Sequence, residues 1–182
     1  MQRRDFITTI GAAFVAASVA SGAHAQTTAL SVVATTGMIA DTARRVGGDL
    51  VAVTALMGPG VDPHAYRQTR TDILAMARAD LVLWNGLYLE AQMEDFFADL
   101  GRKVAISAVG ESVPADDLIS HDDYELRFDP HGWMDPTLWT HAVTAVRDAR
   151  SEAAPDLAEQ FDANATAYIA ELTRLADYAQ TS

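Results

Sequence analysis

Hydrophobic positions along this chain follow two alternating patterns: short continuous runs, and longer stretches in which apolar residues recur every three or four positions. Short runs rich in β-branched residues are typical of buried strands, and they occur at residues 30–34, 50–56, 80–84 and 103–107. The helical spacing lies between them, at residues 38–46, 69–78 and 89–100. This alternation predicts an α/β fold, in which a four-stranded parallel sheet is flanked by helices.

Local signals indicate where several of these helices begin and end. Thr69, followed three residues later by Asp72, forms a capping-box pattern at the start of a helix. Pro136 suits the first turn of a further helix, which is expected to run to about residue 149. From residue 155 to residue 179 the helical spacing continues without a break. It predicts a single helix about 37 Å long at 1.5 Å per residue, longer than a four-stranded lobe requires.

The loops that leave the predicted strands are the first places to look for a ligand. In a parallel sheet the binding crevice lies outside the carboxyl ends of the strands, here after residues 34, 56 and 84. Thr35, Thr36 and Asn85 stand at such ends and could donate hydrogen bonds to a ligand or to neighbouring loops. Residues 109–130 are irregular and rich in acidic side chains, so we expect them to form a solvated surface segment.

Two of the loops carry the same tripeptide, Asp-Pro-His, ending at His64 and at His131. Neutral imidazole is a common ligand of transition metals, and proline makes the turn that presents it stiff. The aspartate of each tripeptide, such as Asp62, could bind the same ion or orient a ring, and Asp135 could also act as an orienting group. From the residues alone, a metal site and a pair of ordinary surface turns both remain open. His121 and His141 are expected at the surface.

Composition excludes several other functions for this chain of 182 residues. The formal net charge of −12 argues against nucleic acid as a partner, because phosphate binding requires clustered Lys and Arg. The sequence contains no cysteine, so disulfides, thiolate metal sites and thiol catalysis are excluded. Any metal must therefore be held by nitrogen and oxygen atoms.

Residues 1–25 have the pattern of an export signal peptide. Arg3 and Arg4 precede an apolar run at residues 10–20, and Ala23-His24-Ala25 fits the small-x-small cleavage pattern. The paired arginines resemble a twin-arginine signal, with an ordinary Sec signal as the alternative. We therefore expect cleavage after Ala25, a mature protein in the periplasm and no role for His24 in ligand binding.

Three longer motifs carry a resemblance to a known family. They are Gly-Val-Asp-Pro-His-Ala-Tyr at residues 60–66, Ala-Asp-Leu-Val-Leu-Trp-Asn-Gly-Leu-Tyr-Leu-Glu at residues 79–90 and Asp-Pro-His-Gly-Trp-Met-Asp-Pro at residues 129–136. Together with the helical pattern at residues 164–175 they resemble the zinc/manganese-type metal solute-binding proteins of ABC importers, the TroA-like and adhesin-lipoprotein family. The resemblance extends over essentially the whole mature chain.

The resemblance implies a receptor that binds a metal without turnover and delivers it to an ABC permease in the inner membrane. It implies that His64 and His131 are metal ligands, with Asp62 as a weaker candidate. It divides the chain into an N-terminal α/β lobe at residues 26–150 and a long linking helix at residues 151–182. A C-terminal lobe, which this sequence does not contain, would supply the remaining ligands, so we expect the chain alone to bind metal weakly.

Alternatives remain open for the identity of the metal and for the class of function. Many zinc-specific members carry a His-rich loop between the two ligand motifs, whereas this chain has only His121 there, among acidic residues. That difference favours Mn²⁺ over Zn²⁺, with Fe²⁺ as a further option. The other functional classes are a small exported metallohydrolase that uses His64, His131 and Asp62, and a metal-free adhesin or interaction domain.

Overall fold

The computed structural model describes residues 29–120 and 127–181, so the predicted signal peptide, His24 and His121 lie outside the described residues. The centre of the fold is a sheet of four strands: β1 (Leu30–Ala34), β2 (Val51–Ala55), β3 (Leu81–Trp84) and β4 (Ala105–Ala108). Every neighbouring pair is parallel and the strand order is β2-β1-β3-β4. Ala34 lies opposite Ala55 and Leu83, so the carboxyl ends of the strands meet at one edge.

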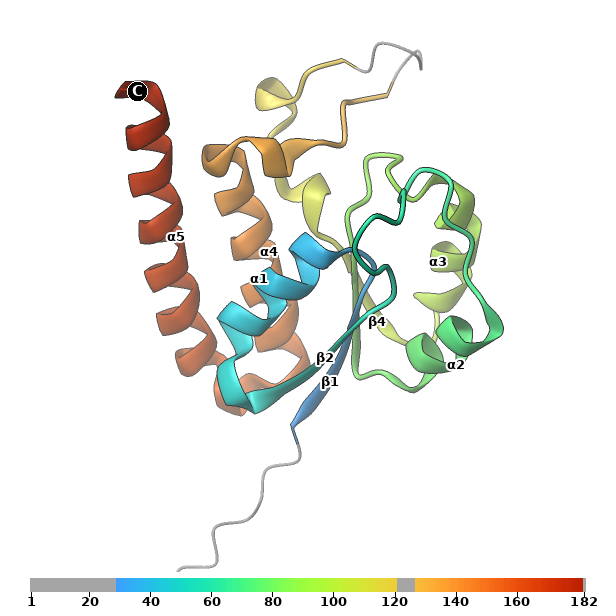
Figure 1. Ribbon diagram of the computed structural model, residues 1–182. Coiled ribbons are helices and arrows are strands. Elements are labelled where there is room, and N and C mark those ends of the chain that lie inside the picture. Colours follow the sequence, from blue (N-terminus) through green and yellow to red (C-terminus); the bar gives the residue numbers. More distant parts are fainter. Residues whose placement is uncertain (1–28, 121–126, 182) are drawn as a thin grey trace, which may run out of the picture.

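Helices cover both faces of the sheet, as Figure 1 shows. On one face lie α1 (Gly37–Gly47), α4 (Pro136–Ala153) and α5 (Ala158–Thr181), packed around the larger hydrophobic core. On the other face lie α2 (Arg70–Arg78) and α3 (Glu94–Leu100), which enclose a second core with Val33 and Val82 of the sheet. Two apolar faces on one sheet explain why the strands read as continuous hydrophobic runs. The predicted α/β class with a four-stranded parallel sheet is confirmed.

The predicted helix boundaries are partly right. The capping box at Thr69 and Asp72 is present, and α4 begins at Pro136, although it continues to Ala153. The helix expected at residues 89–100 is shorter, because the chain after β3 turns through positive φ angles and then forms a 3₁₀ turn at Ala91–Met93. Only Glu94–Leu100 is α-helical.

The long C-terminal helix, α5, is part of the fold rather than only an extension of it. Phe161, Ala165 and Leu172 are buried in the larger core, and the side-chain amide of Asn164 donates to the carbonyl oxygen of Val46 at 2.9 Å. Farther along the helix, the large side chains of Leu175 and Tyr178 are exposed. None of the helices in the described ranges is long and apolar enough to cross a membrane.

One charged side chain is fully buried beneath these helices. Arg150 of α4 has 0% exposure, and its three guanidinium nitrogens have no hydrogen-bond partner among the described residues. The guanidinium carbon of Arg150 lies over the ring of Phe161, 5.7 Å from the ring centroid. Burial lowers the pKa of Arg150 to about 10, because a charged group loses its hydration in the core.

Candidate metal centre

His64 and His131 come together at the carboxyl edge of the sheet. His64 lies in the loop between β2 and α2, and His131 lies in the segment that leads into α4. The two residues are 67 positions apart in the sequence, yet their Nε2 atoms are 3.3 Å apart. Their ring planes are tilted by 49°, so the rings meet at their nitrogen atoms rather than stacking. Both residues are exposed, as access for an ion requires.

The same local turn presents each histidine. The Oδ1 atom of Asp62 accepts a hydrogen bond from the backbone N–H of His64 at 2.9 Å. In the second tripeptide, Oδ1 of Asp129 accepts from the backbone N–H of His131 at 2.8 Å. An aspartate that binds the backbone two residues ahead stabilises a turn, and the intervening proline restricts it further. The Asp-Pro-His tripeptide therefore forms the same type of turn at both positions, and Asp62 stabilises the backbone of its own loop.

Asp129 has a second role that Asp62 does not show. Its Oδ1 atom also lies 2.7 Å from Nδ1 of the His131 ring. A carboxylate at Nδ1 favours the tautomer that carries its proton there, which leaves the lone pair of Nε2 available to a metal. Trp133 packs against the same ring in an edge-on arrangement, with centroids 5.0 Å apart. Asp135, expected as an orienting group, instead accepts from the N–H of Thr137 and caps α4.

The distance between the two Nε2 atoms matches shared coordination of one ion. Imidazole nitrogens bind Zn²⁺ at about 2.0–2.1 Å, so two of them at a tetrahedral angle lie about 3.3–3.4 Å apart. The observed separation between His64 and His131 is 3.3 Å. No group of three or more His, Asp or Glu side chains placed to hold a metal occurs within residues 29–120 and 127–181. The described residues therefore offer two imidazole nitrogens at a separation that would suit one shared ion, and no complete set of ligands.

Behind the two loops lies a buried polar network centred on Glu90. This side chain has 0% exposure, and its Oε1 atom accepts from the Thr35 hydroxyl at 2.6 Å and from the Asn85 N–H at 2.9 Å. Its Oε2 atom accepts from the Gly86 N–H at 3.2 Å. Burial raises the pKa of the Glu90 carboxyl above its ordinary value, and these hydrogen bonds oppose the increase. Thr35 and Asn85, noted at strand ends in the sequence, thus belong to this network.

Sequence reasoning did not single out Glu90. Its motif, Asn-Gly-Leu-Tyr-Leu-Glu, ends on an acid that follows an apolar run, and an acid in that position was the available signal. The network also includes Asn85, whose side-chain Nδ2 donates to the carbonyl oxygen of Pro130 at 3.1 Å. Pro130 directly precedes His131, so the network reaches the backbone of the second histidine loop.

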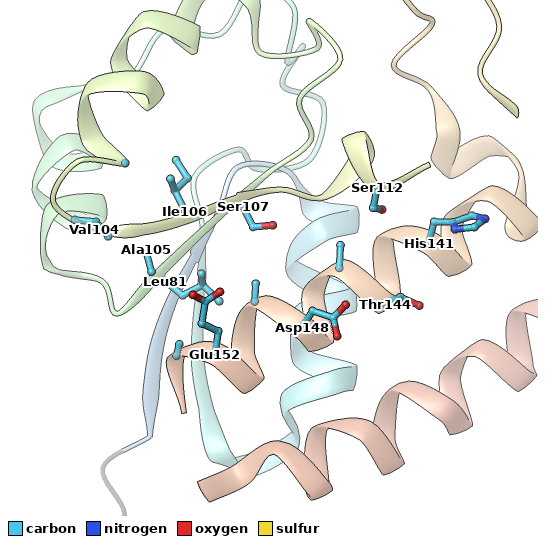
Figure 2. Close-up of a pocket in the computed structure, with 14 residues that line it drawn as sticks. Leu81, Val104, Ala105, Ile106, Ser107, Ser112, His141, Thr144, Asp148 and Glu152 are labelled. Atoms are coloured by element: carbon cyan, nitrogen blue, oxygen red, sulfur yellow. The ribbon is translucent and has the colours of Figure 1, made fainter. Parts of the chain in front are cut away.

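A groove of 790 Å³ lies elsewhere, between β4 and one side of α4 (Figure 2). His141, expected at the surface, is half-buried and lines this groove with Asp148 and Glu152. None of the residues that line it belongs to the loops that carry His64 and His131. The groove is therefore separate from the paired histidines.

This chain is similar to a known protein family and to several characterised proteins. Residues 32–182 match the family model ZnuA, described as zinc-uptake complex component A, periplasmic. The chain is 42% identical over 146 residues to the manganese-binding lipoprotein MntA of Bacillus subtilis, an alignment that covers 80% of this chain and 47% of MntA. It is 39% identical to the zinc-binding protein TroA of Treponema pallidum (81% of this chain, 47% of TroA). It is 35% identical to the iron-binding protein YfeA of Yersinia pestis (79% of this chain, 46% of YfeA).

Solved structures agree with these matches. The structure of the periplasmic zinc-binding protein TroA from Treponema pallidum superimposes with a TM-score of 0.79 at 38% identity. That superposition covers 83% of this chain and 54% of the TroA chain. The chain thus spans about half the length of the relatives that it matches. Those relatives are named as binding proteins, in agreement with the expectation that this chain is not an enzyme.

Proposed function

Because this chain belongs to the ZnuA family of periplasmic metal-uptake proteins, we propose that it binds a divalent transition metal ion as the cargo of an ABC importer. The observation that carries the proposal is the 3.3 Å separation of the Nε2 atoms of His64 and His131, which come from distant loops. Two imidazole nitrogens at that distance suit one shared ion. The two histidines are the proposed ligands, and Asp62 is a weaker candidate because its Oδ1 atom already holds the backbone of its own loop.

The two histidine loops present the ion with ligands of fixed geometry. Asp129 holds the proton of the His131 ring at Nδ1, so that Nε2 can donate its lone pair. Metal binding requires neutral imidazole, because a ring nitrogen that carries a proton has no lone pair to donate. Capture and release of this kind need no chemical transformation of the cargo.

Manganese is the proposed ion in preference to zinc, with iron as the third option. The relatives are named for all three metals, so their names do not decide between the three ions. Support for manganese comes from the segment between the ligand motifs, which contains acidic residues and only His121 as a further histidine. A carboxylate as third ligand would favour Mn²⁺, whereas a third imidazole would suit Zn²⁺.

In this proposal the chain is the N-terminal lobe and linking helix of a two-lobed receptor. A second lobe supplies the remaining ligands, an inner-membrane permease receives the ion, and the protein works in the periplasm after removal of residues 1–25. One relative is named as a manganese ABC transporter substrate-binding lipoprotein, from Streptococcus gordonii, which supports the link to an importer. The exposed apolar side chains near the end of α5, including Leu175, would suit contact with a second lobe.

Calorimetric titration of the chain with Zn²⁺ and with Mn²⁺ tests the proposal. We expect weak binding that falls below the detection limit of the calorimeter in His64→Ala and in His131→Ala. The matched control is His141→Ala, which removes a histidine that lies in the separate groove. It should leave the dissociation constant unchanged. Binding that survives both ligand substitutions would contradict the proposal.

A further inference from the structure

The turn that follows β3 adopts a conformation that its side chains disfavour. Gly86, Leu87 and Tyr88 have φ angles of 77°, 53° and 70°. Positive φ is ordinary for glycine but unfavourable for residues that carry a Cβ atom, and two such residues in succession need support from their surroundings. The turn lies directly behind the second histidine loop, because Asn85 contacts Pro130.

Glu90 supplies that support. Its carboxylate accepts hydrogen bonds from the backbone N–H groups of Asn85 and Gly86, at the start of the turn. It also binds the hydroxyl of Thr35, which follows β1. The carboxylate thereby ties together the ends of the neighbouring strands β1 and β3, and it closes the strained turn that follows β3. Because Glu90 is completely buried, water cannot replace these contacts.

Asn85 connects this turn to the segment that carries His131. Its Nδ2 atom donates to the carbonyl oxygens of Pro130 and Gly86, both at 3.1 Å. Its backbone oxygen accepts from the N–H of Gly110 at 2.8 Å, and a Cβ atom at Gly110 would lie only 2.7 Å from that oxygen. Asn85 is only 1% exposed, and its contacts with Pro130 and Gly110 fix its position. The residue that it binds, Pro130, immediately precedes His131.

The first histidine loop is anchored differently. Tyr66, two residues after His64, donates its hydroxyl to Oδ2 of Asp72 at 2.7 Å. That contact ties the loop to the start of α2 and involves neither Asn85 nor Glu90. A change in the turn after β3 should therefore displace His131 relative to His64, rather than displace both together.

We propose that Asn85 and Glu90 are positioning residues of the metal site, which set the affinity for the ion by holding Pro130 so that the His131 Nε2 atom faces that of His64. Neither residue touches the ion in this arrangement. The inference rests on the proposed function, since it assigns to the buried network a role in that same site. Loss of groups that orient metal ligands typically weakens metal binding by about 10–100-fold.

The test is Zn²⁺ titration of the full chain carrying Asn85→Leu, which keeps the approximate shape of the side chain and removes its amide. The matched control is Asn164→Leu, because Asn164 also donates its Nδ2 to a backbone carbonyl, that of Val46 at 2.9 Å, but far from the histidines. We expect the dissociation constant to rise about 10–100-fold for Asn85→Leu and to stay unchanged for Asn164→Leu, even where both lower the melting temperature equally. The visible spectrum of bound Co²⁺, which reports coordination geometry, should change only for Asn85→Leu.

A second variant keeps the test decisive if Asn85→Leu does not fold. Glu90→Gln retains an acceptor for two of the three hydrogen bonds and should weaken Zn²⁺ binding less than Asn85→Leu, but measurably. Unchanged Zn²⁺ affinity in a folded Asn85→Leu or Glu90→Gln variant would overturn the positioning role while leaving the proposed function intact. Absence of His64- and His131-dependent Zn²⁺ binding in the unsubstituted chain would overturn the proposed function, and the positioning role with it.

Discussion

The carboxylate of Asp129 lies 2.7 Å from Nδ1 of His131, while Nε2 of the same ring faces His64. One ring nitrogen is thus held by the protein and the other is presented to an ion. Asp129→Asn removes the negative charge that stabilises this tautomer, and we expect it to weaken metal binding about tenfold. Titration calorimetry with Zn²⁺ measures the effect.

Asp135→Asn is the matched control for that experiment. It removes the same charge from the same segment, and asparagine caps a helix about as well as aspartate. We expect its Zn²⁺ affinity to remain close to that of the unsubstituted chain. Equal losses in the two variants would mean that only the overall negative charge matters, and the orienting role of Asp129 would be wrong.

Asp72 should make the stability of the first histidine loop depend on pH. Burial alone would raise the pKa of Asp72, but hydrogen bonds from Thr69 and Tyr66 outweigh burial and lower it. An acid whose pKa is lower in the folded state adds stability above its unfolded pKa of about 3.9, and that stability is lost as the pH falls through the folded value. Asp72→Asn should therefore cost about 1 kcal/mol at pH 7 and less near pH 3. Urea unfolding at the two pH values measures this, and a pH-independent difference would contradict it.

Arg150 is expected to lower the stability of the fold. Its guanidinium is buried without a hydrogen-bond partner among the residues that the structure describes. Replacing such a group with an apolar side chain of similar length removes the desolvation penalty, so Arg150→Met should raise the free energy of unfolding by about 1–3 kcal/mol at pH 7. Because burial lowers the pKa of Arg150 to about 10, the penalty should be constant below that pH and diminish above it.

Arg147→Met is the comparison for this prediction. Arg147 is on the same helix but bonds to the carboxylates of Asp148 and Asp162 at the surface. Its replacement should change the free energy of unfolding by no more than about 1 kcal/mol, without a gain. Chemical denaturation of both variants separates the two cases. Destabilisation by Arg150→Met would show that its contacts, such as that with Phe161, outweigh the cost of burial.

Features that depend on neighbouring residues could be predicted from the sequence. The strand at residues 30–34 and the capping box of Thr69 and Asp72 are confirmed, because each depends on a few consecutive residues. His64 and His131 could be predicted as candidate ligands because each ends an Asp-Pro-His tripeptide within a longer motif of consecutive residues. Their approach to one another followed from topology, since parallel strands bring their carboxyl-end loops to one edge.

Features that depend on distant contacts could not be predicted. Glu90 binds Thr35, 55 residues away, and the apolar run that precedes Glu90 does not by itself show that the acid is buried or which residue it binds. The late start of α3 at Glu94 reflects the strained turn that Glu90 closes, rather than helix propensity. Arg150 falls on a helix face that packing buries, although arginine is usually exposed.

The shared coordination of one ion by His64 and His131 is tested most directly by X-ray absorption at the zinc edge on the Zn²⁺-loaded chain. The account predicts two imidazole nitrogens per zinc ion at about 2.0–2.1 Å in the unsubstituted chain. It predicts one in His131→Ala at a Zn²⁺ concentration high enough to occupy the weakened site, with His141→Ala unchanged. A zinc ion bound by oxygen atoms alone, or an imidazole count that His64→Ala and His131→Ala leave unaltered, would contradict it.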